Sequence, residues 1–116
     1  MTEYKLKRAY ESSSPQDGFR VYIDRLWPQG LSHETFHYDL WEKDIAPSTE
    51  LREWFHSDPE KRWKSFENKY MAELKSNPAF TEFKKLLSAK PVVTLLYSSH
   101  DEEHNNAVVV QKVLRS

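Results

Sequence analysis

The segment Val92–Tyr97 constrains the fold more than any other part of the chain, because every residue in it except Thr94 is apolar. Amphipathic helical patterns flank this segment on both sides. A short apolar run between helices is typical of a strand that is buried on both faces of a parallel sheet. We therefore expect an α/β fold in which residues 92–97 form the central strand.

Three other segments show the alternation of apolar and polar side chains that indicates strands. They are residues 4–10, residues 19–24 and residues 36–41. Together with the central strand, they predict a small, mostly parallel sheet of about four strands with helices packed on it.

Capping residues and apolar residues at three- to four-residue spacing predict four helices. A polar residue before a helix can accept hydrogen bonds from the free first-turn amides, and proline tolerates the first helical position. The expected helix starts are Ser48, Asp58–Pro59, Asn77–Pro78 and, for the last helix, Asp101–Glu103. We expect the first helix to end at about His56 and the last at about Arg115.

Length and composition limit the kind of protein this can be. The 116 residues suit a single domain that spans residues 1–116. The absence of cysteine excludes disulfides, thiolate nucleophiles and iron–sulfur clusters. The chain has two glycines, fewer than a dinucleotide-binding loop or a Walker phosphate loop requires. We therefore expect no cofactor.

The charge balance argues against a strongly electrostatic partner. Seventeen basic and eighteen acidic residues give a net charge of −1, so no global positive field attracts nucleic acid or an anionic membrane, although a local basic patch is compatible with this total. The first residues are polar, and no apolar run approaches membrane-spanning length. The sequence predicts a cytoplasmic protein without a membrane partner.

Two segments follow predicted strands at the place where α/β proteins usually bind ligands. Ligands lie beyond the carboxyl ends of parallel strands, where loops converge and helix N-termini point outward. This rule selects Asp24–Arg25 and Ser98–Asp101. We expect His104 and Asn105 in the first turn of the helix that follows. If the two strands are neighbours, all of these groups face one crevice.

The residues after the second predicted strand admit two interpretations. Asp24 and Arg25 suit a carboxylate and a clamp for phosphate or carboxylate groups, because the arginine fork donates two parallel hydrogen bonds. They equally suit an ion pair that ties the strand end to a helix. Trp27 is either a stacking platform for a ligand or an anchor for its loop.

His100 and His104 stand four residues apart, as two metal ligands on one helix face would. The zincin pattern requires glutamate directly after the first histidine, but Asp101 occupies that position. We therefore expect no metal site. Ser98 stands near His100 and Asp101, but residues so close in sequence rarely reach the geometry of a catalytic triad, and helix capping is the expected role.

Several strings, in order along the chain, match one known family. They are Gly18–Val21, Asp24–Pro28 followed by Gly30, Ala46–Arg52, and Thr94–Tyr97 followed by Asn105 and Ala107. On these strings the chain resembles, over nearly its whole length, the YeaO-like branch of the DUF488 family, a family of domains of unknown function. The resemblance implies a small α/β fold and implies no activity.

The strings that carry the resemblance are unusually polar. Polar groups are costly to bury without partners, so the resemblance implies a shared polar network or site. Its members would be Arg20, Asp24, Arg25, Ser48, Arg52 and Asn105. Gln29 stands where the family commonly has arginine, and Ser57 where histidine is frequent. Both departures weaken any model that needs a strongly cationic pocket or a catalytic imidazole at those positions.

Three functional hypotheses remain. The leading one is a site for a small anionic ligand, binding or catalytic, in which Arg25, Arg52 and Arg20 hold the anion. Asp24 or His104 would then supply acid–base chemistry.

The second hypothesis is a nucleic-acid or protein interaction module in which Trp27 stacks and basic side chains hold a backbone. The third is a structural protein whose polar motifs form internal ion pairs. The sequence leaves open whether the protein is an enzyme and which oligomer it forms.

Overall fold

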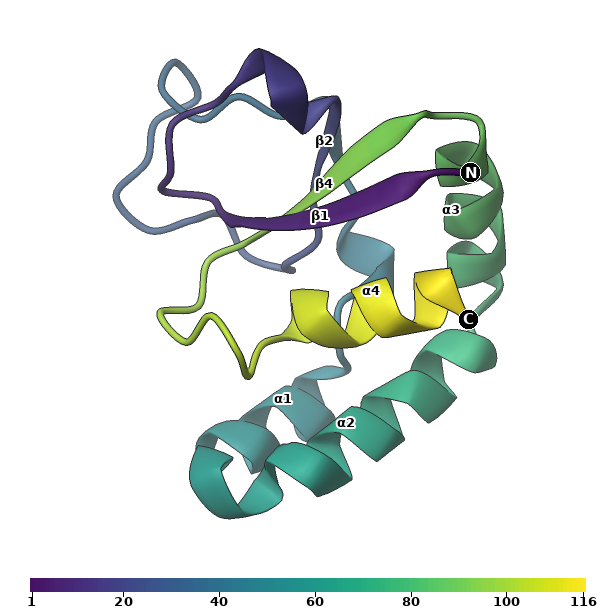
Figure 1. Ribbon diagram of the computed structural model, residues 1–116. Coiled ribbons are helices and arrows are strands. Elements are labelled where there is room, and N and C mark those ends of the chain that lie inside the picture. The colour runs from purple at the N-terminus through teal and green to yellow at the C-terminus, as the bar shows by residue number, and fades with distance from the viewer.

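Four parallel strands form a single sheet in the computed structural model, which describes residues 1–116 (Figure 1). The strands are β1 (Glu3–Arg8), β2 (Phe19–Tyr22), β3 (Leu40–Trp41) and β4 (Val92–Tyr97). They lie in the order β1-β4-β2-β3, and every neighbouring pair is parallel. The prediction of a small α/β fold with a mostly parallel sheet is confirmed.

The strand β4 lies inside the sheet, between β1 and β2. Leu95 is fully buried and is in register with Leu6 of β1 and Val21 of β2. Thr94 is also buried, and its hydroxyl donates to the backbone carbonyl of Asp17 at 2.7 Å, so this buried polar group has a partner. The most apolar segment of the chain is therefore a central strand, as predicted.

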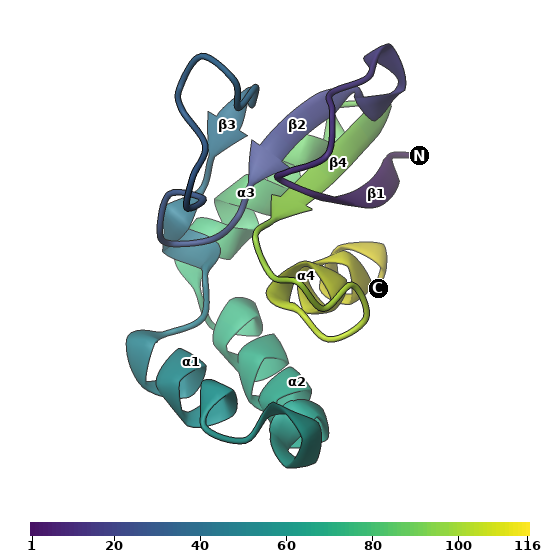
Figure 2. The same cartoon turned by 90° about the vertical axis from the view of Figure 1, so that its left-hand side faces the viewer.

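Four α-helices accompany the sheet. They are α1 (Thr49–His56), α2 (Pro59–Lys75), α3 (Pro78–Ser88) and α4 (Asn106–Arg115), with short 3-10 helices at Pro15–Asp17 and Lys43–Ile45. The helix α4 lies against β1 and β4, α2 lies against α4, and α1 packs beside α2 (Figure 2). None of these helices is both long enough and apolar enough to cross a membrane.

The two faces of the sheet are covered in different ways. On one face, residues such as Val21 pack with residues of all four helices in one core. On the other face, Tyr22 and Leu96 pack against Phe36 and neighbouring rings of the segment 24–41. The strand β4 is thus buried on both faces, but a loop rich in aromatic residues covers one of them.

Three of the predicted helix starts are confirmed. The side chain of Ser48 accepts from the amide of Leu51 at 3.3 Å, and that of Asn77 accepts from Ala79 at 3.0 Å. Asp58 precedes α2, but its side chain accepts no capping hydrogen bond. The proline that follows it at the first helical position marks this start instead.

The predicted start of the last helix is wrong, because α4 begins at Asn106 and not near Asp101. Asn105 is the N-cap, and its side-chain oxygen accepts from the amide of Val108 at 3.1 Å. The carboxylate of Asp101 instead accepts from two backbone amides of its own turn. His104 and Asn105 therefore precede the helix.

The strand predicted at residues 36–41 is also too long, because β3 contains only Leu40 and Trp41. The amide of Phe36 donates to the carbonyl of Ser32 at 3.0 Å, within a turn. The aromatic residues alternate here because they fill the cluster over the sheet. The strands β1 and β2 likewise each end two residues earlier than predicted.

Candidate functional site

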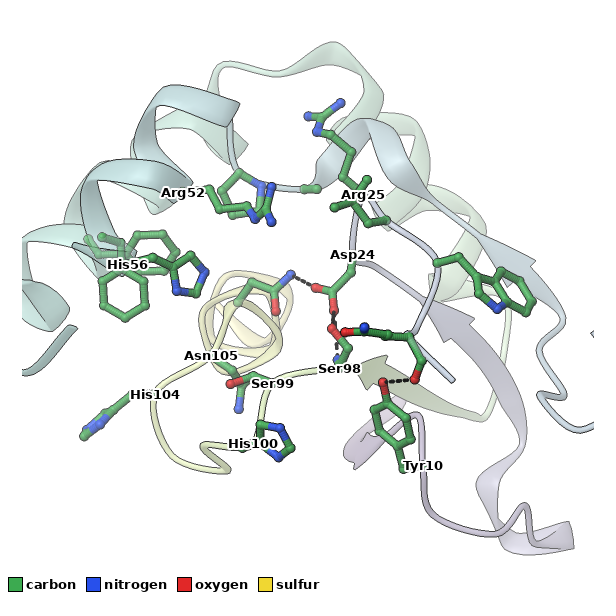
Figure 3. Close-up of a pocket in the computed structure, with 18 residues that line it drawn as sticks. Tyr10, Asp24, Arg25, Arg52, His56, Ser98, Ser99, His100, His104 and Asn105 are labelled. Carbon is green, nitrogen blue, oxygen red and sulfur yellow. Dashed lines mark hydrogen bonds between the residues drawn. The ribbon is translucent and has the colours of Figure 1, made fainter. Parts of the chain in front are cut away.

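A pocket of about 470 Å³ opens where β2 and β4 end (Figure 3). The segment that follows β2, the loop between β4 and α4, and one face of α1 line it. Small-molecule sites commonly measure about 300–1,000 Å³, so this pocket has a suitable size. The two segments that the strand-end rule selects meet here, because β2 and β4 are neighbours.

Asp24 lies in the middle of this pocket wall and is held by neutral donors. Its Oδ2 accepts from the backbone amide of Ser98 at 2.8 Å and from the Ser98 hydroxyl at 2.6 Å. Its Oδ1 accepts from the side-chain amide of Asn106, at the start of α4. Asp24 therefore ties the end of β2 to the loop after β4, near the positive end of the α4 dipole.

Tyr22 contacts both Asp24 and the segment that follows it. Its hydroxyl donates to the carbonyl of Leu26 at 2.7 Å and lies 3.4 Å from Oδ2 of Asp24. Burial, together with the negative charge of Asp24, raises the pKa of Tyr22 far above its usual value. The phenol therefore stays protonated and acts as a fixed donor.

Only two of the arginines in this chain lack a partner within it. Four donate hydrogen bonds to other residues, and these are Arg8, Arg20, Arg62 and Arg115. Arg25 and Arg52 take part in no side-chain hydrogen bond and no ion pair, and both are exposed. Both line the pocket.

The helix α1 presents Arg52 and His56 to the pocket. The two residues stand four apart, which places them on one helix face, and both side chains extend toward Asp24 (Figure 3). Phe55 lines the same wall and stacks on Phe66 of α2 at 4.3 Å. Sequence reasoning assigned no role to His56, although its spacing from Arg52 would have indicated one.

The loop after β4 places His100 and His104 at the pocket. The ring of His104 lies 3.3 Å from the carboxylate of Asp101 and packs against Trp63. Hydrogen bonds from backbone amides, helped by His104, lower the pKa of Asp101. No group of three or more potential ligands lies close enough to hold a metal ion.

Trp27 lines the pocket but is anchored in its loop. Its indole nitrogen donates to the carbonyl of Leu31 at 2.6 Å. The ring of His33 lies 4.0 Å from its ring, and Phe36 and Trp41 contact it edge-on. The indole ring is therefore packed against other rings of its own segment.

Arg20 does not reach the pocket. Its guanidinium pairs with Asp17, and its Nε donates to the carbonyl of His37 at 2.7 Å. Lys7 also pairs with Asp17, at 3.1 Å. Burial raises the pKa of Asp17, but the hydrogen bonds from Ser14, Lys7 and Arg20 outweigh it, so the pKa lies below its usual value. This group is an internal ion network.

Ser48 and Asn105 have structural roles. Ser48 caps α1 and donates to the carboxylate of Glu73 at 2.7 Å, outside the pocket. Asn105 lines the pocket, but its side chain caps α4 and donates to the carbonyl of Asp101 at 2.9 Å. Both the nitrogen and the oxygen of its amide are thus engaged within the chain.

Ser98 and Asn106 are site residues that sequence reasoning missed or read as loop capping. Both donate to Asp24 and line the pocket. Ser98 directly follows β4, and this position could have indicated its role. Asn106 is the first residue of α4, but the helix start predicted near Asp101 concealed this position.

The fold and the pocket define a small α/β protein with a ligand-sized cavity at the strand ends. The chain belongs to the inactive DUF488-N3 subclade, whose family model matches residues 3–116. The resemblance to the DUF488 family is therefore confirmed.

Two relatives illustrate how widely the sequence is shared. The uncharacterized protein YeaO of Escherichia coli (strain K12) is 39% identical over 112 residues, which cover 95% of this chain and 95% of YeaO. The uncharacterized protein Rv3073c of Mycobacterium tuberculosis (strain ATCC 25618 / H37Rv) is 38% identical over 110 residues, covering 95% of this chain and 92% of the relative. No solved structure matches the chain significantly.

Proposed function

We propose that the protein binds a small molecule through an anionic group in the pocket between β2, β4 and α1. The observation that carries this proposal is the position of the two arginines without partners. Arg25 and Arg52 both line this pocket, whereas every other arginine is engaged within the chain. Guanidinium groups bind carboxylates and phosphates through paired, charge-assisted hydrogen bonds.

Arg52 is the primary anion-binding residue in this proposal. It extends from a helix toward the middle of the cavity, together with His56 (Figure 3). Arg25 leaves the chain beside Asp24, and its side chain extends away from that carboxylate (Figure 3). Arg25 therefore adds positive potential at the edge of the site, although the sequence predicted that it would hold the anion together with Arg52 and Arg20. Arg20, Ser48 and Asn105 have no part in binding.

The proposed activity is binding without turnover. The description of the family as an inactive subclade supports this restriction. Gln29 lines the pocket and is uncharged, whereas the resemblance to the family implies an arginine at this position. Asp24 is engaged by Ser98 and Asn106. We expect the binding to take place in the cytoplasm.

Calorimetric titration with inorganic phosphate and with 3-phenylpropionate tests the proposal. We expect at least one of these anions to bind, and Arg52→Gln to weaken it about tenfold, which corresponds to one charge-assisted hydrogen bond. Arg25→Gln should weaken it less. Lys85→Gln is the matched control, because it removes one exposed positive charge on α3, outside the pocket.

The same experiment separates the competing function. Equal affinities of Arg52→Gln and Lys85→Gln for the anion would refute the assignment of this pocket. Salt-dependent binding of single-stranded DNA that Trp27→Ala abolishes would instead support the interaction module. The packing of the Trp27 ring against His33 and Phe36 gives that alternative no support.

A further inference from the structure

The pocket contains charges of both signs that do not neutralise each other. Asp24, Arg25 and Arg52 all line it. The ion pairs of the chain lie elsewhere or at its rim, and none of them includes these three residues. Asp24 is surrounded by neutral donors only. A site in which neither the positive nor the negative charges have an ionic partner is complementary to a ligand that itself carries both charges.

Asp24 has capacity for one more donor. A carboxylate offers about four acceptor positions, two on each oxygen. Its Oδ2 already accepts from the amide and hydroxyl of Ser98 and lies near the hydroxyl of Tyr22. Its Oδ1 accepts only from Asn106. One position on Oδ1 is therefore free to accept a hydrogen bond from a bound molecule.

The remaining surface of the pocket is suited to an apolar group. Phe55 and Phe66 stack on each other in its wall. Leu26 and Tyr10 also line it, and they are among the few large apolar side chains that the protein exposes, at 59% and 39%. A ligand with an apolar body would cover this surface and gain about 25 cal/mol for each Å² of apolar area it removes from water.

We infer that the ligand is a small zwitterion with an apolar body, such as an amino acid with an aromatic side chain. Its anionic group binds Arg52, and its amine donates to Oδ1 of Asp24. This inference rests on the proposed function and names the class of ligand. A simple anion would gain the contact with Arg52 but would be repelled by Asp24, and a simple amine would meet the opposite balance.

A series of four probes with the same aromatic ring tests the inference in the wild-type protein. Phenylalanine and 3-(4-aminomethylphenyl)propionate carry both charges, at short and long separation. The probe 3-phenylpropionate carries only the anion, and phenethylamine only the amine. We expect one of the two zwitterions to bind about tenfold more tightly than either singly charged probe, as one added charge-assisted hydrogen bond implies.

Two variants assign the effect to Asp24. In the Asp24→Asn variant, 3-phenylpropionate should still bind, and the zwitterion should bind with about the same affinity as 3-phenylpropionate. Glu34→Gln removes an exposed carboxylate outside the pocket and should leave the preference unchanged. If Asp24→Asn fails to fold, as circular dichroism would show, the four-probe comparison in the wild-type protein decides the question without it.

The possible outcomes separate the inference from the proposed function. If 3-phenylpropionate binds as tightly as both zwitterions, the zwitterion inference is wrong and anion binding stands. A zwitterion preference that persists in a folded Asp24→Asn variant also overturns it. If neither phosphate nor any probe with a carboxylate binds, the proposed function fails first. Binding of phenethylamine as tight as that of the zwitterions overturns the zwitterion inference, because the carboxylate then adds no affinity. Binding of phosphate and 3-phenylpropionate still decides the proposed function in that case.

Discussion

Arg20 and Arg25 belong to neighbouring motif strings five residues apart, yet they have opposite environments. Arg20 is buried and pairs with Asp17, which Lys7 also contacts. Arg25 is exposed and has no partner within the chain, although Asp24 is its neighbour. The group around Arg20 neutralises its own charges, so it has no unpaired charge with which to bind a ligand. The group around Arg25, which includes Asp24, contains positive and negative charges that have no ionic partner in the chain.

The comparison shows what distinguishes a structural polar motif from a binding site. Both groups combine arginine with aspartate, and both Arg20 and Arg25 lie in strings on which the chain resembles the DUF488 family. What differs is whether the chain itself supplies the counter-charge. Substitutions and acid should therefore change the free energy of unfolding most where the chain supplies the counter-charge and least at the pocket.

The largest effect is expected where the chain supplies the counter-charge. Asp17→Asn leaves Arg20 and Lys7 without their carboxylate, and the side chains of Asp17 and Arg20 are each only 8% exposed. Removing one partner of a buried ion pair costs about 3–5 kcal/mol. Urea denaturation should show a loss of this size, with Glu34→Gln as an exposed control. A loss below about 1 kcal/mol would mean that this network is not structural.

A smaller effect is expected when acid removes the same charge. Burial raises the pKa of Asp17, and the hydrogen bonds from Ser14, Lys7 and Arg20 lower it by more, so the folded pKa lies below its usual value of 3.8. The stabilisation is therefore complete above the usual pKa and is lost as the pH falls through the lowered one. Because burial opposes the hydrogen bonds, the net contribution is smaller than the cost of removing the pair.

Urea denaturation between about pH 6 and pH 3 measures this contribution. The free energy of unfolding should fall more steeply with acid in the wild-type protein than in Asp17→Asn. The hydrogen bond from Lys112 lowers the pKa of Glu67, and Lys64 lowers it further. Glu67 therefore makes the free energy of unfolding depend on pH to the same extent in both proteins. Parallel pH profiles for the two proteins would show that Asp17 titrates alike in the folded and unfolded states.

The sequence predicts where a residue lies in the fold better than it predicts which residues its side chain contacts. The strand β4 is identified by its continuous apolar run, and the strand-end rule then places Asp24 and the loop after Tyr97 at one edge. The start of α4 could not be predicted from acidic residues, because Asp101 organises a turn of its own. The contrasting roles of Arg20 and Arg25 depend on contacts between distant segments, which local patterns do not contain.

The smallest effect on stability is expected at the pocket, where the chain leaves its charges unpaired. The double variant Arg25→Gln and Arg52→Gln removes two exposed side chains that donate no hydrogen bond within the protein. Their like charges face one cavity, and their removal relieves a weak repulsion. We expect a free energy of unfolding within about 0.5 kcal/mol of the wild type, tending toward higher stability at low salt.

The same double variant should lose binding of the anionic probes, so stability and affinity would change independently. Urea denaturation and calorimetric titration on one preparation give both quantities. A loss of stability above about 1 kcal/mol would show that Arg25 or Arg52 has a structural partner, as Arg20 has. Such a result would remove the contrast between the two regions and with it the reason for assigning the pocket to a ligand.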